Sequence, residues 1–166
     1  MTLILQCLAA CIVFTAIMIP TLLKDPLLYI MSYPTTIRKK VESLPQYASV
    51  IQKKEQKHFA RKVASVFVIA ILFAVAARLS GAKNFVSAAT HVFILFMSVN
   101  LFDLFVLDFG WFCHSLKVRI PGTEDMDAEY RSLCHHIRGA VIGTGLCAFT
   151  AALSGGMVHF LSLFLL

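Results

Sequence analysis

The stretch that decides the fold is residues 85–114, which read FVSAATHVFILFMSVNLFDLFVLDFGWFCH. Residues 85–102 carry no charge, and the apolar pattern continues through Asp103 and Asp108 to about Cys113. A helix needs about 20 apolar residues to cross a hydrocarbon core of about 30 Å, because no water is available there to the backbone. Residues 85–113 are therefore predicted to form a membrane-spanning helix.

Three further stretches have the same apolar character. Residues 3–23 and 139–166 contain no Asp, Glu, Lys or Arg, and residues 63–82 contain only Arg78. The whole chain of 166 residues is 58% hydrophobic and 14% charged, whereas soluble domains are about 45–50% apolar and about 25% charged. This balance excludes an ordinary soluble domain, a disordered chain and a small secreted disulfide scaffold.

The expected fold is all-α, a single transmembrane domain over residues 1–166 in which four helices form an antiparallel bundle. The spans are predicted at about 3–23, 63–82, 85–113 and 139–166, and the cytoplasmic segments at 24–62 and 114–138. Only residues 80–84, which include Gly81, separate the second span from the third. A turn this short makes the two helices antiparallel neighbours.

Basic residues predict the orientation, because Lys and Arg are retained on the cytoplasmic side of short loops. Residues 24–62 contain nine basic and three acidic residues, and residues 114–138 contain four of each. Only Arg78 and Lys83 fall on the other side. Both termini are therefore expected outside, with the two long segments in the cytoplasm. The predicted location is the plasma membrane.

The first cytoplasmic segment is predicted to be basic and helical. Thr35 or Thr36 can cap a helix that begins near Ile37, Pro45 interrupts it, and a second helix leads into the next span. The charges either fix the topology only or also bind anionic lipid headgroups, at about 1 kcal/mol for each basic residue near the surface. The candidate headgroup ligands are Arg38, Lys39, Lys40, Lys53, Lys54, Lys57, Arg61 and Lys62. Nucleic-acid binding is not expected, because the aromatic residues lie in the spans rather than among these charges.

Polar side chains gather at the inner end of the third span. An α-helix turns 100° per residue, so Asp103, Trp111 and His114 fall within about 60° of Asn100. Asp108 lies about 80° from Asn100, at the edge of this stripe. Counted at about 1.5 Å per residue, Asp103 lies at the edge of the inner leaflet and Asp108 at the headgroups. Ionisable residues in a span are costly, so these carboxylates mark a candidate site.

The fourth span carries a matching stripe of small and weakly polar residues, spaced three or four apart: His136, Gly139, Gly143, Cys147, Thr150 and Ser154. Small residues at this spacing let two helices approach closely, so plain packing is one interpretation. If the stripe faces the third span, the two helices enclose a polar pocket that opens to the cytoplasm. A salt bridge from the aspartates to Arg138 is the competing interpretation. The predicted pocket residues are Asn100, Asp103, Asp108, Trp111, His114, Glu124, His136 and Arg138.

Carboxylate and imidazole groups near this pocket form a candidate metal site. Ligands of this kind suit Zn, Fe or Mn, and the candidates are Asp108, His114, Glu124, His135 and His136. Their spacing matches no fixed motif such as H-E-x-x-H, and adjacent histidines cannot both face one point on a helix. His91 and His159, at similar depth in the third and fourth spans, offer a second pairing that could hold haem. Hydrogen bonds to Ser or Thr neighbours are the alternative for these two histidines.

Three classes of function fit these features. The first is a small transport-related or accessory membrane protein whose pocket binds a cation or a proton. The second is a membrane enzyme that uses the same Asp, His and Glu side chains as metal ligands or as acid and base. The third is a structural or interaction protein in which the polar residues only hold helices together. Besides the lipid bilayer, a transport role predicts a partner in a homo-oligomer or larger membrane complex, because four helices rarely enclose a private pathway.

Overall fold

The computed structural model describes the backbone of residues 2–164, and the side chains of this range except those of 48–50 and 52–62. Over this range the regular structure is entirely helical, which confirms the all-α prediction. The elements are α1 (Leu3–Lys24), η1 (Pro26–Ser32), α2 (Thr35–Ser43), α3 (Pro45–Leu79), α4 (Phe85–Phe102), η2 (Asp103–Phe112), η3 (Leu116–Val118), α5 (Asp127–Tyr130) and α6 (Leu133–Phe164). Of these, η1 and η3 are 3₁₀-helices and η2 is a π-helix.

Three stretches of the described chain are long and apolar enough to cross a membrane: Leu3–Lys24, Phe85–Phe112 and Asp127–Phe164. The second predicted span is shorter than expected, because its apolar helical part runs from Val63 to Leu79. This part belongs to α3, a single helix of 35 residues that begins at Pro45. α2 ends at Ser43, so the helical segment is interrupted at Pro45 as predicted. Pro45 occupies the first turn of the next helix, where a proline has no N–H group to satisfy. The last helix also starts earlier than predicted, at Leu133 rather than at Gly139.

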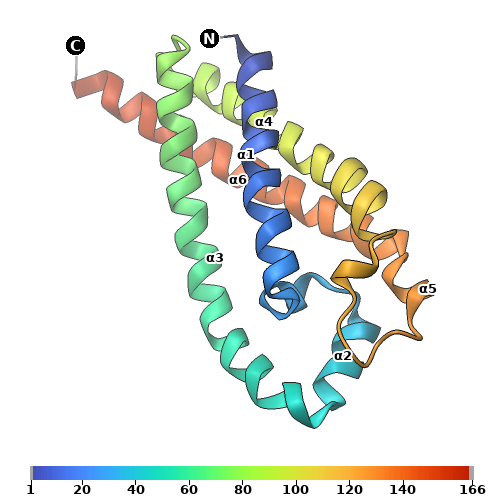
Figure 1. Ribbon diagram of the computed structural model, residues 1–166. Coiled ribbons are helices and arrows are strands. Elements are labelled where there is room, and N and C mark those ends of the chain that lie inside the picture. The colour runs from blue at the N-terminus through green and yellow to red at the C-terminus, as the bar shows by residue number, and fades with distance from the viewer. Residues whose placement is uncertain (1, 165–166) are drawn as a thin grey trace.

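The long helices run back and forth, so that both termini lie at one end of the molecule (Figure 1). The turn between α3 and α4 lies at the same end (Figure 1), and Gly81 in it has a φ of 92°, which only glycine adopts without strain. The Asn84 side chain then caps α4 by accepting a 2.9 Å hydrogen bond from the Ser87 N–H. α2 and α5 lie at the opposite end, and α4 with η2 runs alongside α6 (Figure 1).

Two glycines of α6 lie where α4 approaches most closely, Gly143 and Gly155. The Asn100 side chain of α4 lies directly on Gly143, and its amide donates a 3.0 Å hydrogen bond to the Ala140 carbonyl. Nearer the other end of α6, Gly155 lies against the backbone of α4. Gly139 belongs to the predicted stripe but is exposed, and a Cβ atom added there would meet no described atom of another element within 4 Å. The close approach therefore begins one turn later than the sequence pattern suggests.

A second contact joins α6 to α3. The Ser154 hydroxyl donates a 2.8 Å hydrogen bond to the backbone carbonyl of Ala70. Both residues are fully buried, and α3 presents alanines at this interface, among them Ala74 and Ala77. Small side chains let the two helices approach, so that one hydroxyl can reach a carbonyl of the neighbouring helix.

The two long connecting segments pack against each other at the end opposite the termini. We call this part the cap; it consists of residues 25–44 and 113–132. α2 turns its apolar side into this core rather than outward. The core joins both segments to α1, α3 and η2 through a set of buried side chains: Leu22, Ile30, Tyr33, Ile37, Val41, Ile51, Phe112, Val118, Ile120 and Tyr130. The cap therefore forms a small folded unit that closes one end of the long helices.

Tyr130 is the polar centre of the cap. Its hydroxyl accepts a 3.0 Å hydrogen bond from the Ile120 N–H and lies 2.8 Å from the Thr123 hydroxyl. Nearby, the Tyr33 hydroxyl donates to the Val118 carbonyl at 3.0 Å. Burial, and after it the proximity of Tyr130, raises the pKa of the Tyr33 phenol, so this hydroxyl keeps its proton and remains a donor.

Tyr130→Phe is expected to lower the free energy of unfolding by about 1–3 kcal/mol, because the Ile120 N–H and the Thr123 hydroxyl lose a buried partner. Thermal unfolding of the full-length protein in detergent micelles measures this effect. Tyr29→Phe removes the same atom from a tyrosine whose hydroxyl makes no hydrogen bond among the described residues, and it should stay near wild type. Equal stability of the two variants would contradict the assigned role of Tyr130.

Candidate functional site

A small cavity lies where the cap meets the long helices. Its volume is about 40 Å³, and since one water needs about 10–15 Å³ on this measure, it has room for a few waters or one small ion. Four elements contribute to its wall, namely α1, η1, η2 and α6. The lining residues are Met18, Ile19, Leu22, Tyr29, Ser32, Tyr33, Asp103, Leu107, Asp108, Trp111, Phe112 and His136.

The π-helix η2 places both aspartates on the cavity. In an α-helix the fifth residue along lies about 140° away, which is why the sequence pattern put Asp108 at the edge of the polar stripe. In a π-helix each N–H bonds to the carbonyl five residues before it, as the 3.0 Å bond from the Cys113 N–H to the Asp108 carbonyl shows. Residues five apart therefore share a face, and Asp103 and Asp108 both line the cavity. The expectation from α-helical periodicity was wrong at this point.

His136 of α6 completes the polar side of the cavity. Its Nδ1 lies 3.1 Å from Oδ2 of Asp108. The side chain of His136 is 4% exposed and that of Asp108 is 29% exposed, so the pair is largely shielded from solvent. The Nε2 atom of His136 is buried without a well-formed hydrogen bond among the described residues. A carboxylate on one ring nitrogen fixes the orientation of the imidazole, and the backbone of Tyr130 also interacts with the ring.

Aromatic rings enclose this pair. The ring centroids of Phe112 and Phe109 lie 5.4 Å and 6.2 Å from that of His136, in edge-to-face geometry. Trp111 and Tyr33 line the same cavity. Apolar rings exclude water and strengthen the electrostatic interactions between the charges that they enclose. The site therefore combines two carboxylates and one imidazole with a largely apolar wall.

Three of the predicted pocket residues lie elsewhere. His114 and Arg138 are exposed, and Asp108 is paired with His136, so the predicted salt bridge to Arg138 is not formed. Asn100 is used in the α4–α6 contact instead, where its amide reaches the Ala140 carbonyl. The stripe from Asn100 to His114 assumed one α-helical period, whereas the helix changes to a π-helix at Asp103.

Glu124 is a fourth predicted pocket residue that lies outside the cavity. It is exposed in the cap, where both carboxylate oxygens accept the Gly122 N–H at 2.9 Å. The hydrogen bond from Gly122, and after it that from the backbone of Glu124 itself, holds the pKa of this carboxyl below its ordinary value. Glu124 therefore stays ionised and shapes the turn at residues 121–124.

The candidate metal ligands do not meet at one point. Among the described residues no group of three or more His, Cys, Asp or Glu side chains could hold a metal ion. The His135 side chain contacts the cap instead, where its Nε2 lies 2.9 Å from the Ser32 carbonyl oxygen. Of the five candidates, Asp108 and His136 form an ion pair, and the rings of His135 and His136 lie edge to face with their centroids 5.6 Å apart.

The two candidate haem ligands have separate surroundings. Nε2 of His91 lies 2.6 Å from Oε1 of the buried Gln6, on α1, and the Gln6 amide donates to the Ser80 hydroxyl at 2.6 Å. His159 is exposed on α6. His91 therefore links α4 to α1 through the side chain of Gln6. The alternative to haem for this residue was a hydrogen bond to a Ser or Thr neighbour, and the observed partner is a glutamine instead.

The candidate headgroup ligands are only partly described. Lys39 and Lys40 are exposed on α2, and Arg38 is half-buried, with Nε 3.3 Å from a carboxylate oxygen of Glu42. Arg38 therefore has an acidic partner within its own helix. The side chains of the remaining candidates lie outside the described part of the structure: Lys53, Lys54, Lys57, Arg61 and Lys62.

Sequence reasoning missed the contribution of η1. Tyr29 and Ser32 come from this element, Tyr33 follows it directly, and all three line the cavity. A signal for them exists, because residues 26–34 read PLLYIMSYP and form an uncharged, aromatic stretch between two prolines within a basic segment. Such a stretch must be buried somewhere, and here it forms part of the cap core.

The arrangement can bind a small cation between the carboxylates, or exchange a proton among Asp103, Asp108 and His136. No protein-family model matches the chain, and neither a curated protein nor a solved structure is similar to it at a significant level.

Proposed function

We propose that the protein is a small multi-pass membrane protein, transport-related or accessory, whose cavity binds a cation or a proton. The observation that carries the proposal is the convergence of Asp103, Asp108 and buried His136 on one small cavity. Ionisable groups at the end of an apolar helix are costly to keep, and they commonly mark ion or proton sites. Helix packing alone would not explain why a cavity lies beside the Asp108–His136 pair, or why Asp103 adds a second carboxylate to its wall.

The proposed topology has four spans, with the termini outside and the cap in the cytoplasm. Three helices have sufficient length and hydropathy, and the apolar part of α3 is the fourth candidate. The 17 residues of Val63–Leu79 rise about 26 Å, close to the thickness of a hydrocarbon core. The positions of the termini in Figure 1 and the excess of basic residues in residues 24–62 agree with this orientation. The proposed location is the plasma membrane.

The charges of the site suggest how it would select its ligand. With His136 neutral, two carboxylates attract a cation, and a proton on His136 cancels part of that attraction. A cation and this proton would therefore compete for the cavity. A volume of about 40 Å³ suits a proton carried by water or a small inorganic cation, and it is too small for an organic substrate.

Asp103→Asn is expected to weaken cation binding at least about tenfold, because it removes one of the two negative charges of the cavity. A tenfold loss of affinity corresponds to about 1.4 kcal/mol of binding free energy. Isothermal titration calorimetry of the full-length protein in detergent, with NaCl, KCl and MgCl₂ as separate probes, measures the affinity. The only tryptophan, Trp111, lines the cavity, so its fluorescence reports the same event and also follows a titration with acid.

Asp125→Asn is the matched control for this experiment, since it makes the same chemical change at an exposed position of the cap. It should bind like wild type. If neither the heat nor the Trp111 emission of the wild-type protein responds to any of the three salts or to pH, the cation and proton proposal is refuted. A lower melting temperature of Asp103→Asn without altered binding would favour the structural alternative.

The enzyme alternative rests on one specific observation. Asp108 orients His136 while Nε2 of the imidazole stays without a well-formed hydrogen bond among the described residues, which is how a carboxylate positions a general base. A substrate would have to reach Nε2 from the cavity. Elemental analysis and an absorption spectrum of the purified protein separate this alternative from a metal or haem enzyme, since a metal-free, colourless protein leaves only acid–base chemistry.

A further inference from the structure

A second cavity lies between α3 and α6, at the end of the molecule that holds the termini. Its volume is about 280 Å³, several times that of the polar site. Hydrocarbon side chains form nearly all of its wall, and we call it the apolar groove. They include Ala74, Val75 and Leu79 of α3, and Met157, Val158 and Leu161 of α6.

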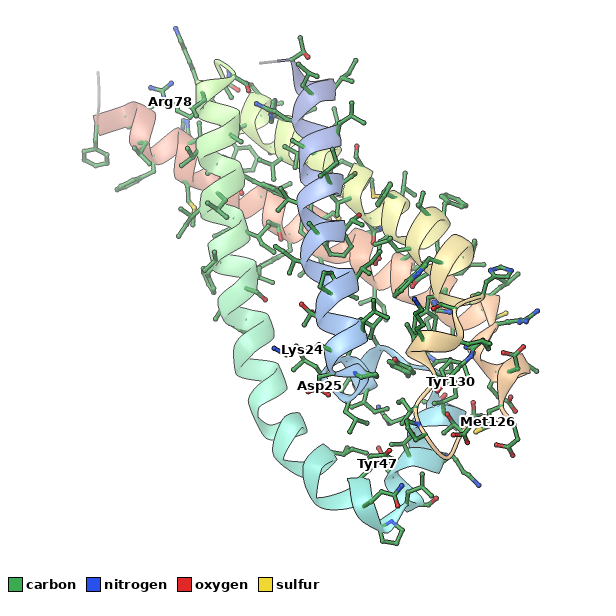
Figure 2. The ribbon with its side chains drawn as sticks, in the orientation of Figure 1. Lys24, Asp25, Tyr47, Arg78, Met126 and Tyr130 are labelled. Atoms are coloured by element: carbon green, nitrogen blue, oxygen red, sulfur yellow. The ribbon has the colours of Figure 1, made fainter. Side chains whose placement is uncertain are left out.

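Arg78 is the charged residue of the groove wall. It lies in the last turn of α3, beside the final turns of α6 (Figure 2). Its Nη1 donates to the Ala82 carbonyl at 3.4 Å, which holds the guanidinium near the turn that follows the helix. A guanidinium has five N–H donors in a planar fork, and this fork matches the oxygens of a phosphate.

We propose that the apolar groove holds an acyl chain of an anionic phospholipid whose phosphate is bound by Arg78. The inference requires the membrane location proposed above, but not the function of the polar cavity, which lies at the other end of the long helices. Within a bilayer the hydrophobic effect does not favour a protein groove over lipid. A chain that fills the groove instead gains van der Waals contacts that the helices do not supply.

The charge at the edge of the groove determines which lipid is preferred. Arg78 lies in the last turn of α3 and Lys83 in the turn that follows it, and of these two basic residues only Arg78 lines the groove. A net negative headgroup complements the guanidinium, whereas a phosphatidylcholine headgroup brings its own cation. The length of groove between Ile71 and Arg78 corresponds to about 10 Å along α3, which accommodates the part of an acyl chain nearest the headgroup.

Native mass spectrometry of the full-length protein, released from nanodiscs of equal parts phosphatidylglycerol and phosphatidylcholine, tests the proposal. The wild-type protein is expected to retain phosphatidylglycerol preferentially. Arg78→Gln should reduce that preference at least about fivefold, and Arg78→Lys should restore part of it. Lys83→Gln removes the same charge at the same end outside the groove, and it should retain the preference of wild type.

Val75→Phe provides an independent test, because Val75 lines the groove but is 53% exposed, so the larger side chain can occupy the groove without entering the α3–α6 contact. It should reduce retention of both lipids. The inference is overturned if Arg78→Gln keeps the wild-type preference, or if Lys83→Gln loses as much as Arg78→Gln, which would indicate a diffuse charge effect. Cation titrations of Arg78→Gln should match wild type. Loss of lipid preference with intact cation binding, or the reverse, therefore distinguishes this inference from the proposed function of the cavity.

Discussion

Gly155→Ala is expected to destabilise the protein by about 2 kcal/mol, because the added methyl group must overpack the α4–α6 contact. A Cβ atom at Gly155 would lie 2.9 Å from the Phe85 carbonyl oxygen and 3.0 Å from the Cβ of Ala89. Neither group can move away without moving α4, since one is backbone and the other is attached directly to it. This cost exceeds the advantage of about 1 kcal/mol that alanine has over glycine in a helix.

Gly156→Ala is the matched control, one residue further along the same helix. A Cβ atom at Gly156 meets nothing within 4 Å, so this variant should be at least as stable as wild type. Thermal unfolding in one detergent measures both proteins under the same conditions. The opposite order of melting temperatures would show that α4 does not lie on α6 as described.

Asp108→Asn is expected to weaken cation binding about a hundredfold, which corresponds to about 2.7 kcal/mol. It removes one carboxylate charge of the cavity and the charged partner of His136, which lies 3.1 Å away. The effect should exceed that of Asp103→Asn, which leaves the oriented imidazole in place. The free energy of unfolding should also fall by about 1–3 kcal/mol, because a buried polar group loses its partner. Calorimetric titration and thermal unfolding measure the two effects separately.

A double-mutant cycle tests whether Asp108 and His136 act as a pair. The double variant Asp108→Asn/His136→Gln should be no less stable than Asp108→Asn alone, because the unpaired imidazole is also removed. Additive losses in the double variant would mean that the two side chains contribute independently. In that case, the hydrogen bond between them would not explain the stability of the site.

The apolar helices could be predicted closely from the sequence. Residues 3–23 and 85–113 were predicted as spans, and the structure has apolar helical stretches at Leu3–Lys24 and Phe85–Phe112. Hydropathy over about 20 residues is a local property, so such boundaries can be found without knowledge of the rest of the fold. The predicted span begins at Gly139, directly after Arg138, whereas α6 begins at Leu133. A helix can continue past an exposed charge, so the end of an uncharged stretch does not mark the end of the helix.

The cap and the geometry of the cavity could not be predicted in this way. The cap core joins Tyr33 to Val118 and Tyr130 across some 85 residues or more of chain, and neither segment alone indicates its partner. The position of Asp108 depended on the helical period, which was assumed to be 3.6 residues per turn. Its contact with His136 follows from a change of period at Asp103, and the side chains of that segment carry no recognised signal for such a change.

The π-helix also makes the length of its own segment important. Each of its turns takes up about one residue more than an α-helical turn, so η2 contains surplus chain that an α-helix would not need. Removal of one residue between Asp103 and Asp108 would let the backbone return to the usual α-helical register. The two aspartates would then stand four residues apart, which is about 40° around an α-helix, so they would still share a face. The π-helix therefore does for residues five apart what an α-helix does for residues four apart, and it keeps both carboxylates on the cavity in spite of the extra residue.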